Sequence, residues 1–103
     1  MTERNSASGP AYRLILFVAG DERNSRIARE NLDRICTEEL DGACQVQVVD
    51  VLEDFTKAAA HQILLTPALV VVEPEPETIV IGNLSDRQKV RTALGLDRTR
   101  KIA

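Results

Sequence analysis

Hydrophobic and polar residues in the first part of the chain follow two different periods. Residues 12–20 (YRLILFVAG) are almost continuously apolar and end at a glycine, which is typical of a strand buried on both faces. Residues 25–40 have apolar residues at helical spacing, with charged residues on the other side. We therefore predict a strand and then an amphipathic helix with Asn24 or Ser25 as its N-cap. The inward positions of this helix are Ala28, Leu32, Ile35, Cys36 and Leu40.

The middle of the chain predicts a second strand and a short helix. Asp41-Gly42 ends the first helix, because glycine readily takes the left-handed conformation of a C-terminal cap. Residues 45–51 (QVQVVDV) are rich in β-branched side chains and predict a strand. Since a helix joins the two strands, we expect them to be parallel. Residues 54–61 predict a short helix with Asp54 as a candidate cap.

The last part of the chain predicts a hairpin and a final helix. Residues 68–72 and 78–82 are two β-rich runs, and the link between them at 73–77 (EPEPE) is short and proline-rich. This acidic turn is either a docking element or a solvated tip that keeps the hairpin edges unpaired. Residues 85–88 (SDRQ) have the form of a capping box, which begins a helix that Gly95 ends.

The predicted order of elements, β-α-β-α-β-β-α, is that of the thioredoxin-like α/β fold. The chain of 103 residues is long enough for one such domain and too short for two. We place the domain at residues 11–97, after a polar, disordered leader at 1–10 and before a basic tail at 98–103. Pro67 precedes a strand at the place where thioredoxin folds hold a cis-proline, and it is our cis-proline candidate.

Composition excludes several kinds of partner. The net charge is −3 and aromatic residues make up only 3% of the chain, which argues against binding a nucleic acid through its phosphates or its bases. No apolar run approaches the roughly 20 residues that span a bilayer. The polar N-terminus has no signal-peptide pattern. We therefore expect a cytoplasmic protein that has no membrane partner.

The cysteines and the histidine form no recognisable catalytic or metal site. Cys36 and Cys44 match no zinc spacing, and in a reducing compartment we expect both to be free thiols. His61 has no partner at a useful spacing. Thioredoxins carry Cys-x-x-Cys after the first strand, but residues 20–25 (GDERNS) contain no thiol at that place. We therefore expect no enzymatic activity, no metal and no cofactor.

Several short motifs occur in a characteristic order and spacing. They are FVAG at 17–20, NS at 24–25, VDV at 49–51, ILLTP at 63–67 and IGNLSDR at 81–87. Together these motifs resemble the KaiB family of circadian-clock proteins, and the similarity covers residues 12–97. Each motif alone is weakly specific, whereas their order and spacing together are specific.

The resemblance implies a non-enzymatic protein that binds KaiC, a hexameric ATPase, and helps to time its phosphorylation cycle. In cyanobacteria such proteins also capture KaiA and displace the sensor domain of a histidine kinase. The family switches fold: a ground state that is a homo-oligomer (dimer or tetramer) rearranges its C-terminal half into a thioredoxin-like monomer, which binds KaiC. A function of another class also stays open, that of a thioredoxin-like adaptor of a signalling kinase with no clock role.

The resemblance also suggests candidate residues. The candidates for partner binding are Glu53, Lys57, Gln62 and Asn83, and those for fold switching are Gly95 and Asp97. The chain departs from the family at several basic positions, which are occupied here by Ile15, Gln62, Thr78 and Ile79. Loss of positive charge weakens an interface that is steered by an acidic partner surface.

Local sequence preferences favour the thioredoxin-like state over the family's ground state. The ground state needs a helix at or soon after residues 68–72, but three consecutive valines there lose χ1 freedom in a helix. The capping pattern at Ser85 resists conversion to a strand. Residues 98–100 (RTR) replace the apolar end of the ground state's last strand. We therefore predict that this chain populates the thioredoxin-like state more than clock members of the family do.

Overall fold

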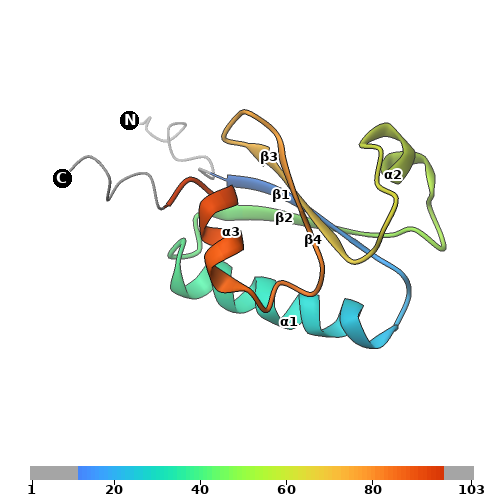
Figure 1. Cartoon of the computed structure of the whole chain (residues 1–103), viewed down its shortest axis with the longest axis horizontal. Helices are drawn as coiled ribbons and strands as arrows, with labels where there is room; N and C mark the ends of the chain where they lie inside the picture. Colours follow the sequence, from blue (N-terminus) through green and yellow to red (C-terminus); the bar gives the residue numbers. More distant parts are fainter. Residues whose placement is uncertain (1–11, 97–103) are drawn as a thin grey trace, which may run out of the picture.

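The computed structural model describes residues 12–96 as a single four-stranded sheet with helices on both faces (Figure 1). The strands are β1 (Tyr12–Val18), β2 (Cys44–Asp50), β3 (Ala68–Glu73) and β4 (Thr78–Ile81), in the spatial order β2-β1-β3-β4. β1 and β2 are parallel, while β3 is antiparallel to both β1 and β4. This is the predicted arrangement, a parallel β-α-β unit followed by a hairpin.

Two helices cover one face of the sheet and a shorter helix lies on the other. The helices are α1 (Arg23–Glu38), α2 (Thr56–Ala60) and α3 (Arg87–Ala93). In Figure 1, α1 and α3 lie together below the sheet, and α2 lies at the opposite end of the molecule from α3. The element order is the predicted β-α-β-α-β-β-α, so the thioredoxin-like fold class is confirmed.

The alternating side chains of β1 divide the core into two parts. Leu14 and Leu16 face α1 and α3, and they pack in one cluster with Leu32 and Val90. Phe17 faces the other way, in a smaller cluster that lies on the α2 side of the sheet. β1 is central and buried on both faces, which explains why its sequence is continuously apolar.

The N-caps of the two long helices differ from those predicted. α1 begins two residues earlier than predicted, because the Glu22 side chain accepts the Ser25 N–H at 3.1 Å. The Ser25 hydroxyl is turned inward instead and accepts the Ala19 N–H at 3.0 Å. Neither Asn24 nor Ser25 is therefore the cap.

The prediction that Ser85 begins a capping box for the last helix is also wrong. Asp86 is the N-cap of α3, and its carboxylate accepts the Lys89 N–H at 3.2 Å. A turn at Leu84, which has φ of 66°, precedes the helix, and in it the Asn83 side chain accepts the Ser85 N–H at 3.0 Å. This turn occupies Ser85 and moves the cap one residue along the chain.

The predicted ends of the helices and the hairpin agree better with the structure. Gly42 takes φ of 78° after α1 and its N–H donates to the Cys36 carbonyl at 2.9 Å. Gly95 takes φ of 80° after α3. The leader at 1–10, Asp97 and the tail at 98–103 lie outside the described residues. Among residues 12–96, no helix is long and apolar enough to cross a membrane.

Candidate protein-binding surface

Two loops are held side by side where the parallel strands β1 and β2 end. One carboxylate oxygen of Asp50 accepts the N–H groups of both Gly20 and Leu52, each at 3.0 Å. Gly20 has φ of +57°, and a Cβ there would lie 3.2 Å from Cδ1 of Leu52. A side chain at position 20 would therefore be strained and crowded, and glycine lets the loop that carries Leu52 lie against the end of β1.

The α2 segment is fixed to the sheet at a few points and otherwise faces solvent. Asp54 accepts the Thr56 N–H at 3.0 Å just before α2, but the N-cap residue is Phe55, so the predicted cap at Asp54 is wrong. Ala58 and Ile63 are buried against β1 and β3. Between them Gln62 takes φ of 59°, and after Ile63 the chain continues with Leu64 and Leu65 outside the core.

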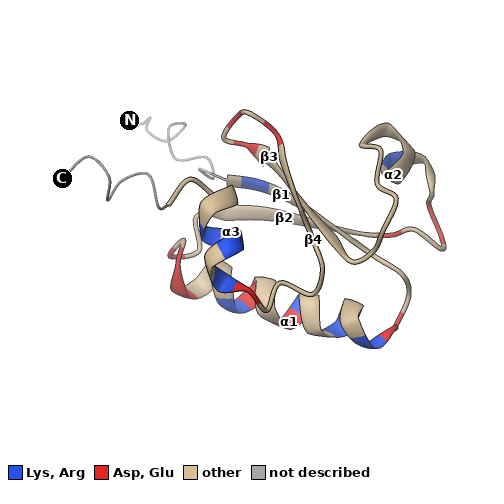
Figure 2. Ribbon diagram, viewed as in Figure 1, with Lys and Arg blue, Asp and Glu red and all other residues tan. Residues whose placement is uncertain are grey.

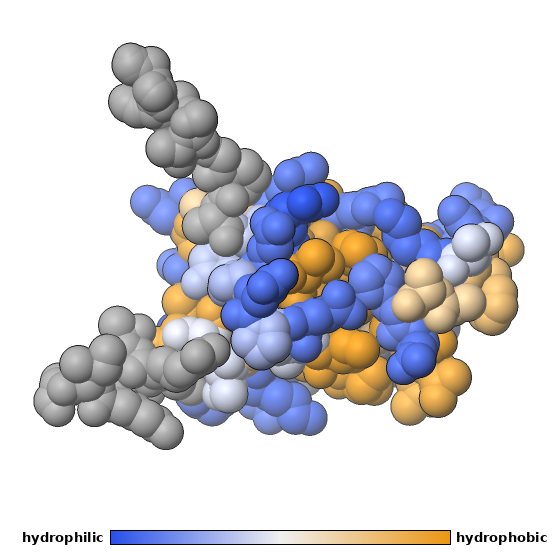
Figure 3. All heavy atoms as spheres, turned by 90° about the horizontal axis from the view of Figure 1, so that it is seen from above, coloured by the Kyte–Doolittle hydropathy of each residue, from blue (hydrophilic) through white to orange (hydrophobic). Residues whose placement is uncertain are grey.

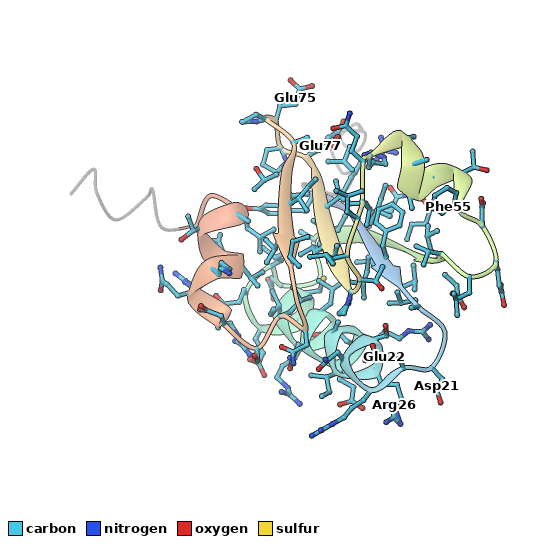
Figure 4. All side chains as sticks on the ribbon, turned by 45° about the vertical axis from the view of Figure 1, so that its right-hand side comes forward. Asp21, Glu22, Arg26, Phe55, Glu75 and Glu77 are labelled. Carbon is cyan, nitrogen blue, oxygen red and sulfur yellow. The ribbon has the colours of Figure 1, made fainter. Side chains whose placement is uncertain are left out.

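This geometry leaves four large apolar side chains exposed around α2. Leu64 is 91% exposed, and the other three are also largely exposed. We call this set, Leu52, Phe55, Leu64 and Leu65, the α2 surface. Figure 3 shows apolar side chains at the end of the molecule where α2 lies, and Figure 4 shows Phe55 beside α2. Groups of exposed apolar side chains of this kind often mark protein-interaction sites.

Three of the four candidate partner-binding residues lie in this region. Glu53 is exposed in the loop between Leu52 and Phe55. Lys57 lies on α2 and donates to the Gln47 carboxamide at 3.4 Å. Gln62 is exposed just before Ile63.

Asn83, the fourth candidate, is not part of this group. It lies after β4, where its side chain donates to the Asn24 side chain at 3.1 Å. Its backbone carbonyl accepts the Asn31 side chain at 2.9 Å, so Asn83 joins the β4–α3 connection to α1. Its contacts in the structure are therefore structural ones.

The position where thioredoxins hold their cysteines has a purely structural arrangement in this chain. Ser25 is fully buried and its hydroxyl is occupied by the Ala19 N–H, so it is not presented as a nucleophile. The Thr66–Pro67 peptide is cis, and the Pro67 carbonyl accepts the Gly82 N–H at 2.9 Å. Figure 4 shows Asp21, Glu22 and Arg26 at the start of α1.

The fold brings Cys36 and Cys44 together, which their sequence spacing did not indicate. Cys36 is near the end of α1 and Cys44 begins β2, and the two thiols lie close enough for one to affect the titration of the other. Burial, together with the interaction of its S–H with the Cys44 sulfur, raises the pKa of the Cys36 thiol to about 12. Both thiols are free. A thiol with so high a pKa is a poor nucleophile, because the thiolate is the reactive form.

The hairpin also supplies His61 with a partner that sequence spacing did not reveal. Its Nδ1 lies 3.0 Å from a carboxylate oxygen of Glu77, which belongs to the acidic turn after β3. Phe17 lies beneath the imidazole, with 6.0 Å between the ring centroids. Among the described residues, His, Cys, Asp and Glu side chains form no group of three that could hold a metal ion.

Comparison with known proteins identifies the family. The model of the KaiB domain matches residues 15–96. The circadian clock oscillator protein KaiB of Microcystis aeruginosa is 44% identical over 86 residues, which are 84% of this chain and 81% of that protein. The oscillator protein KaiB1 of Synechocystis is 42% identical over 84% of this chain and 80% of its own length. The chain belongs to the KaiB family.

Solved structures place this KaiB-family chain in the thioredoxin-like fold. The N-terminal domain of Synechococcus elongatus SasA superposes with a TM-score of 0.68 at 22% identity, covering 84% of this chain and 85% of that domain. A chloroplastic thioredoxin z superposes with a TM-score of 0.68 at 19% identity, covering 95% of this chain and 92% of that one. The chain is thus a homologue of circadian clock oscillator proteins, with a fold shared by SasA and the thioredoxins.

Proposed function

We propose that this protein is a non-enzymatic regulator that binds a KaiC-type ATPase ring through the α2 surface and modulates its ATPase or phosphorylation cycle. The observation that carries the proposal is the exposure of Leu52, Phe55, Leu64 and Leu65 around α2 in a KaiB domain. Burying exposed leucine and phenylalanine side chains against a partner contributes about 1.5–3 kcal/mol for each that becomes fully buried. Membership of the KaiB family supports the choice of partner.

The charged residues around the α2 surface fit a role in orienting the partner. Lys57 and Glu53 lie next to the apolar side chains and carry opposite charges, and Gln62 is neutral where the family has lysine. Rim charges of this kind act on the association rate and on specificity more than on total affinity. We infer that apolar contact supplies most of the affinity and that Lys57 supplies the remaining positive charge on this rim.

Size-exclusion chromatography with a cognate KaiC-type hexamer, in ATP and in ADP, tests the proposal. Co-elution with the hexamer in one nucleotide state supports it, and a Leu64→Ser variant should co-elute less. The matched control is Ile81→Ser, which changes an exposed apolar residue on β4 and should co-elute like the unmodified chain.

The alternative function, an adaptor of a signalling kinase without a clock role, gives the opposite result. It predicts no co-elution with the hexamer in either nucleotide. The similarity of this fold to the SasA N-terminal domain is compatible with both functions, so only a binding experiment separates them.

A further inference from the structure

We propose that a groove on the α2 side of the sheet binds a compact phosphate-type anion, for which inorganic pyrophosphate is the probe. This site differs in kind from the α2 surface, since it would hold a small molecule and not a protein. The groove has a volume of about 240 Å³ and lies between α2 and the strands β1, β2 and β3. We call it the basic groove, and its polar lining residues are Arg13, Gln45, Gln47, Lys57 and His61.

The strand register directs three of these side chains to one face of the sheet. Arg13 and Ile15 of β1 are paired with Gln45 and Gln47 of β2. Ile15 packs in the core cluster on the α2 side, and residues in register on neighbouring strands share a face of the sheet. Arg13, Gln45 and Gln47 therefore all point to the α2 side. Ile15 and Val72 supply the apolar part of the lining.

The α2 segment adds two further side chains that can donate hydrogen bonds to a ligand. Lys57 and His61 are four residues apart, so they lie on the same side of the helix, and both line the groove. The Lys57 ammonium donates to the Gln47 carboxamide at 3.4 Å, which holds it over the sheet. Nδ1 of His61 contacts Glu77 at 3.0 Å, which leaves Nε2 for a ligand. Figure 2 shows basic residues both at the start of β1 and on α2.

The arginine and the lysine of the basic groove are only weakly neutralised by the described residues. Arg13 lies 3.9 Å from a Glu73 carboxylate, a distance beyond a hydrogen bond, and both side chains are about half exposed. The printed polar contact of Lys57 is with the neutral Gln47. Glu73 and Glu77 contact basic side chains of the groove, but neither lines it. Because an exposed ion pair of this length contributes little, an anion can compete with Glu73 for Arg13.

The size of the groove and the kinds of donor in it favour phosphate as the ligand chemistry. Pockets for drug-sized molecules measure roughly 300–1,000 Å³, so this groove fits a smaller ligand. An arginine guanidinium binds phosphate oxygens in pairs, and a lysine ammonium acts as a point charge beside them. Because the donors come from β1, β2 and α2, a ligand must present several acceptor oxygens to reach them together. Pyrophosphate meets this requirement in a compact molecule, whereas a single carboxylate does not.

Titration of the isotope-labelled full chain with inorganic pyrophosphate, followed by backbone chemical shifts in buffer without divalent cations, tests the proposal. Saturable shifts should occur in the basic groove, while those on α1 should be small. Arg13→Gln should weaken binding on the order of tenfold, because it removes the paired donors of the guanidinium. Arg13 is chosen because Lys57 also belongs to the rim of the α2 surface. The matched control Arg29→Gln removes the same charge from an exposed position on α1 and should change the Kd by less than about twofold.

Citrate at equal ionic strength tests the class of anion, and it should bind more weakly than pyrophosphate. Unchanged shifts on α1 and α3 show that the Arg13→Gln variant is folded. The proposal is overturned if pyrophosphate gives no saturable shifts, if folded Arg13→Gln binds it unchanged, or if Arg29→Gln loses as much affinity. Citrate that binds as tightly as pyrophosphate overturns it too. These outcomes do not depend on the hexamer, because Arg13 lies outside the α2 surface.

Discussion

A carboxylate oxygen of Glu39 lies 3.2 Å from the guanidinium of Arg87, and this contact joins the end of α1 to the first turn of α3. The other oxygen of Glu39 contacts Arg91, and Glu38 lies 3.1 Å from Arg87. The hydrogen bonds that Arg87 donates to Glu38 and Glu39 raise the pKa of its guanidinium. Figure 2 shows the basic residues of α3 above the acidic C-terminal turn of α1.

Glu39 is therefore the acidic residue that joins α1 to α3 through the most ionic contacts. Its side chain is largely buried and contacts two arginines, whereas that of Glu38 is more exposed and contacts Arg87 alone. We expect Glu39→Gln to lower the free energy of unfolding by about 1 kcal/mol, mainly through the partly buried contact with Arg91. Urea denaturation measures this. Glu38→Gln is the matched control, and an effect as large as that of Glu39→Gln would contradict the account.

The thiols should be free but slow to react in the folded protein. Ellman titration should find two thiols after denaturation, while Cys36 in the native protein should react slowly because its pKa is about 12. Adding Cys44→Ser leaves one thiol and isolates the rate of Cys36. Fewer than two thiols in the denatured, unreduced protein would show a disulfide and contradict this prediction.

The raised pKa of Cys36 also predicts a loss of stability at alkaline pH. The folded-state pKa is about 12 against an ordinary 9.0, so between these values the unfolded chain releases the proton while the folded chain keeps it. The free energy of unfolding should therefore fall as pH rises through this range, with no such contribution below it. Cys36→Ala should show a shallower fall in urea denaturation across the same pH range. An unchanged slope would show that Cys36 does not titrate in this way.

Much of the fold could be predicted because its strongest signals are local. The continuous apolar run of β1 and the helical period of α1 depend on burial alone, and their structures follow the prediction. The caps were missed because each depends on a contact made in three dimensions. Ser25 is turned toward Ala19 in the core, and the turn held by Asn83 moves the start of α3 to Asp86.

The candidate site was predicted less completely, for a similar reason. Family resemblance selected polar residues, and three of them do lie around α2. The exposed leucines were not chosen as candidate binding residues, because apolar residues are expected to be buried. Ile63, the apolar residue before Leu64, is in fact buried. Which of Ile63, Leu64 and Leu65 is buried depends on the direction that the chain takes after the left-handed turn at Gln62, and no local pattern indicates that turn. The pairing of His61 with Glu77 likewise needs the hairpin to form first.

The state that dominates in solution is a separate prediction, which backbone chemical shifts test. We expect extended shifts through β3 and β4 and helical shifts through α3, because the valines of β3 disfavour a helix and Asp86 caps α3. The KaiB ground state would instead give helical shifts at residues 70–72 or extended shifts at 92–96. Either of these patterns as the major species would contradict the prediction.

Binding of the KaiC-type hexamer by variants of the α2 surface tests the central claim most directly. Isothermal titration should give measurable affinity for the unmodified chain and for the control Ile81→Ser. The double variant Phe55→Ser/Leu64→Ser should bind at least tenfold more weakly, since two exposed apolar side chains are lost from the contact. Its chemical shifts outside the α2 segment should match those of the unmodified chain, which shows that it is folded. A folded double variant that binds the hexamer as tightly as the unmodified chain, or an unmodified chain that does not bind at all, would contradict the account.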